Sequence, residues 1–226
     1  MNPSITSGVR SGQAGVNIPS GLATLHGDLA VPISAQGIVL FAHGSGSSRH
    51  SPRNRQVAHI LRSGSLGTLL MDLLTAEEEE EDRHTGRYRF DIGRLVGRLV
   101  DATKRVRAQS GTQSLRVGLF GASTGAAAAL IAAANGPDLV SAIVSRGGRP
   151  DLAGAALSNV QAPTLLIVGG HDSTVLDLNE RAMAQLTCEK RLEIIPRATH
   201  LFEEPGALEA VARLARAWFK RYLAAS

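Results

Sequence analysis

The stretch that decides the fold lies near the middle of the chain and reads Leu119-Phe120-Gly121-Ala122-Ser123-Thr124-Gly125. It ends an apolar run typical of a buried strand and leads at once into an alanine-rich segment typical of a buried helix, 124–134. A serine with glycine two residues before and two residues after fits a sharp strand-to-helix turn, because small residues let neighbouring backbone pass. Such a turn lifts the hydroxyl off the sheet, so we predict that Ser123 is a nucleophile. Without this context, the same five residues would fit an ordinary tight turn.

Apolar runs on both sides of this stretch predict further strands that are covered on both faces. These central strands are expected at 37–42, 67–74, 116–121, 140–145, 163–169 and 192–195, after two edge strands at 15–18 and 22–31. Apolar periodicity predicts the remaining helices at 53–62, 90–108, 175–186 and 207–223. Strand and helix alternate at least five times, which predicts an α/β fold with a doubly wound, mostly parallel sheet and helices on both faces.

In a sheet of this kind the chemistry lies at the carboxyl ends of the strands. A serine nucleophile needs a base, and the base needs a carboxylate that orients it. Asp172 is the first acid after the strand predicted at 163–169, and His200 lies in the loop between the last predicted strand and the last predicted helix. The chain order serine, acid, histidine fits a catalytic triad of Ser123, Asp172 and His200. Asp177 is a rival acid and His171 a rival base.

The loop after the first central strand is predicted to complete an oxyanion hole. It begins His43-Gly44-Ser45-Gly46-Ser47-Ser48-Arg49. We expect one N–H donor from Thr124, at the N-terminus of the helix after Ser123, where the helix dipole also favours an anion. We expect the second donor at Ser45, with Gly46 as the alternative, since glycines at 44 and 46 let the backbone approach a ligand.

Other polar residues of this loop allow two interpretations. Gly44, Gly46 and Arg49 are candidate substrate-binding residues. Arg49, together with Arg53 and Asn54, either holds the loop in place or meets an anionic substrate. His43 is expected to be a polar residue buried under the loop, because nothing in the pattern requires a second base.

These residues resemble the α/β-hydrolase superfamily. The loop 43–49, the following Ser51-Pro52-Arg53-Asn54 and the absence of a cap insertion are most similar to the dienelactone hydrolase family. The resemblance covers nearly the whole chain beyond about residue 20. It implies an α/β-hydrolase fold without a cap domain, no cofactor, and the roles given above to Ser123, Asp172 and His200. We expect one domain over 1–226, with 1–20 as a loosely packed segment.

Two departures bear on the substrate. Dienelactone hydrolases carry a cysteine nucleophile, where this chain has Ser123, and an arginine shortly after the histidine, where Leu201-Phe202-Glu203-Glu204 follows His200. We therefore predict a serine hydrolase that cleaves carboxylic esters or lactones through an acyl-enzyme. The same triad would also serve an acyltransferase or a thioesterase. A non-catalytic binding protein on this fold is the alternative outside enzymes.

Composition excludes several other classes. The 226 residues are 43% hydrophobic and carry a net charge of +4, but the arginines are scattered, which argues against a nucleic acid or membrane partner. Gly44-Ser45-Gly46 followed by Asp72 mimics a dinucleotide-binding fingerprint, yet Arg49 stands in place of the third glycine. The seven histidines show no metal-binding spacing, and Cys188 is the only cysteine.

The dense acidic run Glu77 to Asp82 is predicted to be a solvated loop. The alternative is a flap beside the pocket that disfavours acidic substrates, with Arg146 and Arg149 as offsetting charges. No secretory signal and no apolar run of membrane-spanning length is visible. We therefore expect a cytoplasmic protein that acts on a small ester or lactone, and a homo-oligomer is compatible with the sequence.

Overall fold

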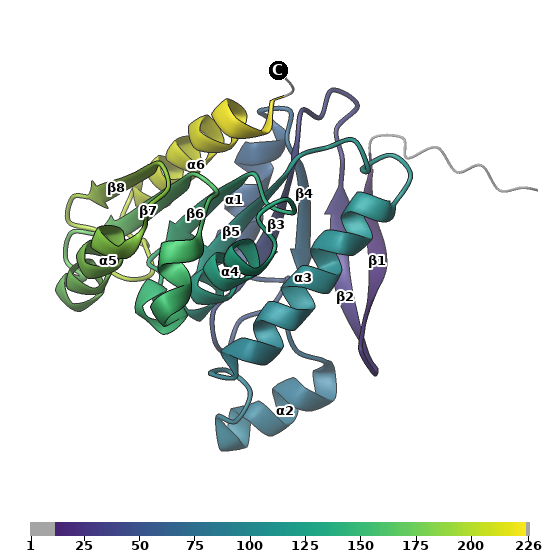
Figure 1. The fold of residues 1–226 in the computed structure, drawn as a ribbon, viewed down its shortest axis with the longest axis horizontal. Coiled ribbons are helices and arrows are strands. Elements are labelled where there is room, and N and C mark those ends of the chain that lie inside the picture. The colour runs from purple at the N-terminus through teal and green to yellow at the C-terminus, as the bar shows by residue number, and fades with distance from the viewer. Residues whose placement is uncertain (1–11, 225–226) are drawn as a thin grey trace, which may run out of the picture.

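The computed structural model describes residues 12–224 of the chain. These residues build an eight-stranded sheet in the order β1-β2-β4-β3-β5-β6-β7-β8 (Figure 1). The hairpin β1–β2 and the β2–β4 pair are antiparallel, and the remaining neighbours are parallel. The strands are β1 (Gln13–Ser20), β2 (Ala23–Ala30), β3 (Ile38–Ala42), β4 (Gly67–Met71), β5 (Val117–Ala122), β6 (Ala142–Arg146), β7 (Thr164–Gly169) and β8 (Lys190–Ile195).

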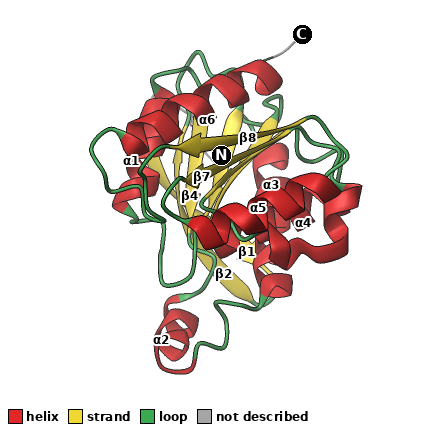
Figure 2. Ribbon diagram, turned by 90° about the vertical axis from the view of Figure 1, so that its left-hand side faces the viewer, coloured by secondary structure: helices red, strands yellow, loops and turns green. Residues whose placement is uncertain are grey.

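Helices cover both faces of the sheet (Figure 2). One face packs on α1 (Pro52–Arg62) and α6 (Ala207–Leu223). The other face packs on α3 (Ile92–Ala108), α4 (Thr124–Asn135), the 3₁₀ segment η1 (Pro150–Asn159) and α5 (Ser173–Gln185). The short helix α2 (Ala76–Thr85) projects from this body. The predicted α/β class and the doubly wound, mostly parallel sheet are confirmed. Within residues 12–224 no helix is long and apolar enough to cross a bilayer.

The centre of the sheet is the best-buried part of the core. Every residue of β3 and β5 is buried, as the continuous apolar runs predict. The rings of Phe41 and Phe120 lie with their centroids 4.9 Å apart on the α1 and α6 side. On the opposite face, alanine-rich α4 is buried along most of its length and lies close to the sheet, since its side chains are small. This rigid centre carries the turn that holds Ser123.

The N-terminal region differs from expectation. Residues 13–20 are not loosely packed, because β1 pairs with β2 along its whole length and Ile18 is fully buried. β2 is not an edge strand, because β4 pairs with its other side. Residues 1–11 of the expected loose segment lie outside the described part of the chain.

The acidic run forms a helix instead of a loop. Thr75 caps α2: its side chain accepts the N–H of Glu78, and the Glu78 carboxylate accepts the N–H of Thr75 at 2.9 Å. This reciprocal capping box satisfies two free donors, and the acidic first turn complements the helix dipole. The prediction of a solvated loop for Glu77 to Asp82 is therefore wrong, and the reason is local capping chemistry.

Candidate active site

Ser123 sits on a sharp turn between β5 and α4. Its backbone angles are φ 51° and ψ −122°, a conformation that costs a non-glycine residue about 1–3 kcal/mol and is common at functional sites. The two glycines of the motif are required by space. A Cβ at Gly121 would lie 2.4 Å from Ala126 Cα, and one at Gly125 would lie 2.2 Å from the carbonyl oxygen of Ala42. The structure thus shows the strained strand-to-helix turn that the sequence predicts.

Asp172 and His200 form a hydrogen-bonded pair. His200 Nδ1 lies 2.7 Å from Asp172 Oδ2. Asp172 occupies the N-cap position of α5, yet its side chain makes no capping hydrogen bond and turns to the imidazole instead. A carboxylate on Nδ1 keeps the proton on that nitrogen and leaves Nε2 as the acceptor. The rival acid Asp177 does not form this pair, and the rival base His171 does not occupy this position.

The loops after β7 and β8 are docked tightly against each other, and this docking creates the pair. A Cβ at Gly169 would lie 2.4 Å from the carbonyl oxygen of Ala198, so only glycine fits there. His171 N–H donates to the same carbonyl at 2.9 Å. Within the loop after β8, the N–H of Thr199 donates to the carboxylate of Glu204 at 2.9 Å. Glu204 is a positioning residue that sequence reasoning missed, although an acid four residues after the histidine was visible.

The end of β6 brings His200 towards Ser123. The carbonyl of Arg146 accepts the N–H of Ser123 at 3.3 Å. A Cβ at the next residue, Gly147, would lie 3.5 Å from His200 Cε1. The serine and the imidazole therefore flank the same two residues. Within residues 12–224 no hydrogen bond joins the hydroxyl of Ser123 to His200, and such contacts commonly tighten when substrate binds.

Free N–H groups gather beside Ser123. The loop 43–50 approaches so closely that a Cβ at Gly44 would lie 2.9 Å from Ser123 Cβ. The hydroxyl of Ser45 lies 3.1 Å from that of Thr124, which links this loop to the start of α4. The N–H groups of Ser45, Gly46 and Thr124 have no hydrogen-bond acceptor in the described part of the chain. These are the donors proposed for the oxyanion, and the geometry leaves both Ser45 and Gly46 available.

His43 supports this loop from below. It is buried, with 6% of its surface exposed, as expected of a polar residue under the loop. Its Nε2 accepts the N–H of Leu73 at 3.0 Å, so its Nδ1 carries the proton and donates to the carbonyl of Gly44 at 2.9 Å. Burial lowers the pKa of His43, in spite of this hydrogen bond and the nearby acids. His43 is therefore a neutral brace and not a second base.

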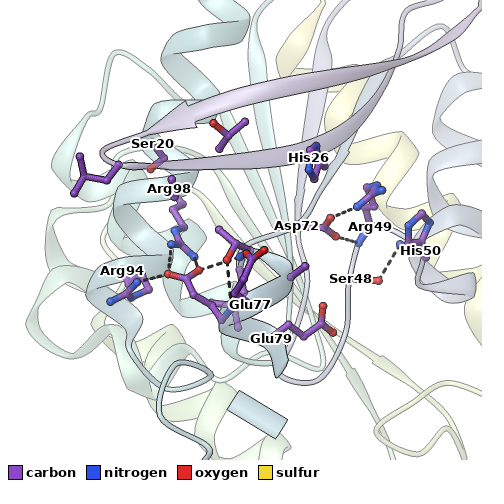
Figure 3. Close-up of a pocket in the computed structure, with 17 residues that line it drawn as sticks. Ser20, His26, Ser48, Arg49, His50, Asp72, Glu77, Glu79, Arg94 and Arg98 are labelled. Atoms are coloured by element: carbon purple, nitrogen blue, oxygen red, sulfur yellow. Dashed lines mark hydrogen bonds and ion pairs between the residues drawn. The ribbon is translucent and has the colours of Figure 1, made fainter. Parts of the chain in front are cut away.

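Arg49 holds the loop through contacts with Asp72. Its guanidinium forms an ion pair with Asp72, and its backbone N–H donates to the same carboxylate at 2.8 Å (Figure 3). These contacts favour the interpretation in which Arg49 holds the loop in place, and substrate binding by Arg49 stays a prediction. They also occupy Asp72, the acid that the dinucleotide-binding interpretation requires. Both residues line an open groove of about 930 Å³ between the β1–β2 hairpin and α2, and the three predicted triad residues do not line it.

The segment after α2 touches the candidate site. The hydroxyl of Ser45 donates to the carbonyl of Arg89 at 3.3 Å. Arg89 is held in turn by Asp82, which is buried in α2 and accepts from Arg89 Nε at 2.8 Å. The acidic helix is thus joined to the loop beside Ser123, as the alternative interpretation of a flap requires. Within the described residues, no cluster of three or more histidine, cysteine or acidic side chains could hold a metal ion.

Comparison with known proteins decides the family. The model of the dienelactone hydrolase family matches residues 32–223. The chain belongs to this family. A crystal structure of a dienelactone hydrolase from Anabaena variabilis is 60% identical, with a TM-score of 0.93, and the match covers 94% of this chain and 99% of that chain. The resemblance inferred from the residue pattern is confirmed, as is the α/β-hydrolase fold.

More distant and longer relatives add two further findings. Est1E from Butyrivibrio proteoclasticus has the same fold, with 14% identity, a TM-score of 0.76 and coverage of 92% of this chain and 98% of that chain. Two proteins of Mycobacterium tuberculosis, strains H37Rv and CDC 1551, are 55% identical over 208 residues. They are provisionally named phosphoribosyl transferases. The match covers 92% of this chain but 46% of theirs, so this dienelactone hydrolase family chain spans about half the length of these relatives.

Proposed function

We propose that this member of the dienelactone hydrolase family is a serine hydrolase that cleaves carboxylic esters or lactones through an acyl-enzyme. The observation that carries the proposal is the Asp172–His200 hydrogen bond of 2.7 Å beside the strained turn of Ser123. Asp172 stands at the N-cap of α5, but its side chain binds the imidazole instead of a backbone N–H of the helix. The helix therefore lacks the stabilisation of a capping hydrogen bond, as expected where the histidine serves as a base. The N–H group of Thr124, which follows Ser123, and those of Ser45 and Gly46, in the loop that approaches Ser123 at Gly44, have no acceptor in the described structure, which supports acyl chemistry.

The proposed reaction has two halves. His200 Nε2 takes the proton of the Ser123 hydroxyl while the oxygen attacks the ester carbonyl carbon, and N–H groups of Thr124 and of Ser45 or Gly46 hold the oxyanion. The bond to the alcohol oxygen breaks, and the imidazolium returns the proton to that oxygen. Water then attacks the acyl carbon and gives its proton to Nε2. Nε2 passes this proton to the Ser123 oxygen as the bond between that oxygen and the acyl carbon breaks, which releases the acid and restores the serine. Asp172 keeps the imidazole in the required tautomer throughout.

The names of the relatives bear on the proposal in different ways. The Anabaena protein is named a dienelactone hydrolase, which supports hydrolysis of an enol lactone or a related ester. Est1E has been crystallised with ferulic acid, an aromatic carboxylic acid, although its 14–15% identity supports only the common fold. The transferase name belongs to proteins of which this chain matches 46%, so we do not carry that name over to this chain.

A covalent probe tests the nucleophile directly. Intact mass is measured after incubation with a fluorophosphonate, for the unchanged protein and for Ser123→Ala. We expect one adduct on the former and none on the latter, followed by hydrolysis of short-chain esters and lactones. A folded protein that takes up no adduct and turns over no ester would refute the proposal and favour a binding protein on this fold.

A second measurement separates hydrolysis from acyl transfer. The ratio of free acid to transferred acyl product is determined in water and with added small alcohols. Hydrolysis as the main reaction predicts that free acid dominates at low alcohol concentration. A protein that forms the adduct, releases little free acid in water and yields a new ester or thioester when an alcohol or thiol acceptor is present would be an acyltransferase on the same triad.

A further inference from the structure

β8 forms one end of the sheet, and its outer edge has no strand beside it in the described part of the chain (Figure 1). Among residues 12–224 the strand is bonded to β7 alone. Its residue Ile194 is 44% exposed, although isoleucine is among the residue types most often buried. An edge strand with an exposed apolar side chain is a ready template for pairing with another strand.

The backbone of β8 presents every second residue to that outer edge. The carbonyls of Glu189 and Ile195 each accept, at 2.8 Å, an N–H from β7 or from the residue after it. Backbone groups alternate sides along a strand, so the odd-numbered residues from Glu189 to Ile195 bond to β7. The residues between them direct both N–H and C=O away from β7: Lys190, Leu192 and Ile194. Within the described residues these outward groups have no hydrogen-bond partner.

The usual protections of an edge are missing from β8. Natural sheets shield their edges with proline, with bulges or with lysine side chains that stay in solvent. β1, at the other end of the sheet, contains Pro19, which has no N–H. β8 contains no proline, and the ammonium group of its single lysine, Lys190, donates to the carbonyl of Leu186 just after α5. The outer edge of β8 is therefore more open to a further strand than the edge of β1.

Charge selects the strand that fits. If β8 pairs antiparallel with the β8 of a second copy and the two-fold axis passes through Leu192, Arg191 lies opposite the second copy's Glu193. The outward residues then meet as Leu192 with Leu192 and Lys190 with Ile194, so every outward N–H finds a C=O. The neighbouring registers are centred on Arg191 or on Glu193 and place two like charges directly opposite each other, which destabilises a strand pair. The sequence of β8 is therefore complementary to itself in one register.

The two charged side chains are available for this contact. Arg191 and Glu193 lie on the same face of β8 and form an ion pair with each other in the single chain. The side chain of Arg191 is 64% exposed, so this pair contributes little to the stability of the chain. In the antiparallel arrangement each charge gains a second opposite charge across the axis, at the short separation of residues that do not bond to each other through the backbone. Self-complementary charge argues for a second copy, and against an unrelated strand, as the occupant of this edge.

The surface next to the edge supplies further contact area. A groove of about 160 Å³ between β8 and α6 is lined by Arg191 and Glu193 and by apolar side chains of the helix. These α6 side chains are Leu214, Ala217 and Trp218. Stable dimers bury about 1,200–2,000 Å² in total, which is more than a short strand ladder provides alone. The α6 side of the groove therefore belongs to the interface.

We propose that two copies of this chain associate through the outer edges of their β8 strands, antiparallel and with the axis at Leu192, into one continuous sheet. A two-fold contact of this kind uses the same surface on both copies and closes at the dimer. Association itself does not depend on the proposed ester hydrolysis. Its consequence for catalysis rests on that proposal: β8 leads into the loop that carries His200, so the pairing would stabilise the strand that positions the base.

Charge reversal tests the register. Sedimentation equilibrium over a range of protein concentrations gives the dissociation constants of the unchanged protein, of Arg191→Glu and of Glu193→Arg. Each variant alone places like charges opposite each other on both sides of the axis, so we expect its dissociation constant to rise about tenfold or more. An equimolar mixture of the two variants brings opposite charges together again and should associate about as tightly as the unchanged protein. The repulsion within each strand persists in the mixture, so recovery there reports the contact between copies alone.

Arg105→Glu is the matched control. It makes the same change of net charge as Arg191→Glu at an exposed position of α3, a helix that packs on β1 at the other end of the sheet. This variant should keep the dissociation constant of the unchanged protein. An equal loss of association in Arg105→Glu and Arg191→Glu would show that net charge matters and would contradict the proposed contact.

Amide hydrogen exchange locates the contact in the unchanged protein. The N–H groups of Leu192 and Ile194 should exchange at least several-fold more slowly at concentrations above the dissociation constant than below it. The N–H groups of Arg191 and Glu193 already bond to β7 and should change much less. Because this measurement involves no substitution, it decides the question even if a variant fails to fold.

The outcomes that would overturn the proposal are distinct from those that bear on hydrolysis. A protein that stays a single chain at every concentration would overturn it, as would a dimer in which the amides of Leu192 and Ile194 exchange as in the single chain. Species that keep growing with concentration would contradict a closed two-fold contact. A β8-paired dimer without esterase activity would refute the proposed hydrolysis alone, and ester hydrolysis by a protein that never associates would refute the β8 contact alone.

Discussion

His43 ties the loop beside Ser123 to the end of β4, because its Nε2 accepts the N–H of Leu73 at 3.0 Å while its Nδ1 donates to the carbonyl of Gly44. Both bonds require a neutral imidazole with the proton on Nδ1. A protonated His43 would lose the bond to Leu73 and place a charge in a buried position. The shape of the candidate oxyanion hole thus depends on the protonation state of His43.

The first prediction concerns stability at mildly acidic pH. Burial lowers the pKa of His43 below the usual 6.5, so at this position the native state binds fewer protons than the unfolded chain. Its contribution to stability is complete above about pH 6.5 and is lost as the pH falls from there towards the native pKa. Urea unfolding should show a lower free energy at pH 5.5 than at pH 7.5, and His43→Asn should reduce that difference. An unchanged difference in His43→Asn, with His26→Asn as the exposed control, would contradict the assignment.

The second prediction concerns the orienting acid. Asp172→Asn keeps the shape of the side chain but removes the charge and favours the wrong imidazole tautomer. We expect kcat for a simple ester to fall by about 10³–10⁴ with little change in Tm. Asp177→Asn, on the exposed face of the same helix, is the control and should retain full activity. Equal loss in both variants would show that α5 as a whole, and not the pair with His200, matters.

The third prediction uses two glycines on helices. Gly125→Ala would drive a methyl group to 2.2 Å from the carbonyl oxygen of Ala42, so the turn or the sheet must shift. We expect a loss of about 1–3 kcal/mol in unfolding free energy, and lower activity. Gly97 on α3 is exposed and has no neighbour within 4 Å of an added Cβ, so Gly97→Ala should stabilise by about 0.5–1 kcal/mol. Chemical denaturation measures both, and a harmless Gly125→Ala would argue against the tight turn.

The fourth prediction concerns Asp82 and the segment that touches Ser45. Burial opposes ionisation of Asp82, but hydrogen bonds from Arg89 and Tyr88 outweigh it and lower the pKa of the carboxyl. The stability that it contributes is present above its usual pKa of 3.8 and is lost as the pH falls through the native value. Asp82→Asn should therefore speed amide hydrogen exchange in residues 76–91 at neutral pH, with Glu80→Gln as the exposed control. Equal exchange in both variants would contradict this role.

The sequence was sufficient to predict those site residues whose positions depend on the order and direction of the strands. Ser123, Asp172 and His200 each lie within five residues of the end of a parallel strand. Parallel strands end at one edge of the sheet, so the placement of all three at this edge follows from topology. The α6 helix runs over Ala207–Leu223, as its apolar stripe predicts, because one helix face must pack on the sheet.

Other features depended on contacts that no local pattern reveals. In the sequence, Arg49 cannot be distinguished from a substrate-binding arginine, because its ion pair with Asp72 becomes apparent only in the folded structure. Arg146 was visible only as a residue after a strand, because its lack of an acceptor is a property of the packed interior. The α2 helix could have been predicted from the sequence, because Thr75 and Glu78 have the spacing of a capping box. The prediction of a loop gave more weight to the dense acidic charge than to this capping pattern.

The position of β8 at the edge of the sheet predicts the order in which the protein loses activity and unfolds on warming. β8 is the last strand, is bonded to β7 alone, and is buried only at its end, whereas β5 is buried throughout. Peripheral elements open at a lower free energy than central ones. The base would thus detach while the nucleophile turn stays folded. Inactivation and melting should then be two separate events, with a temperature interval in which the molecule is compact, unaggregated and catalytically silent.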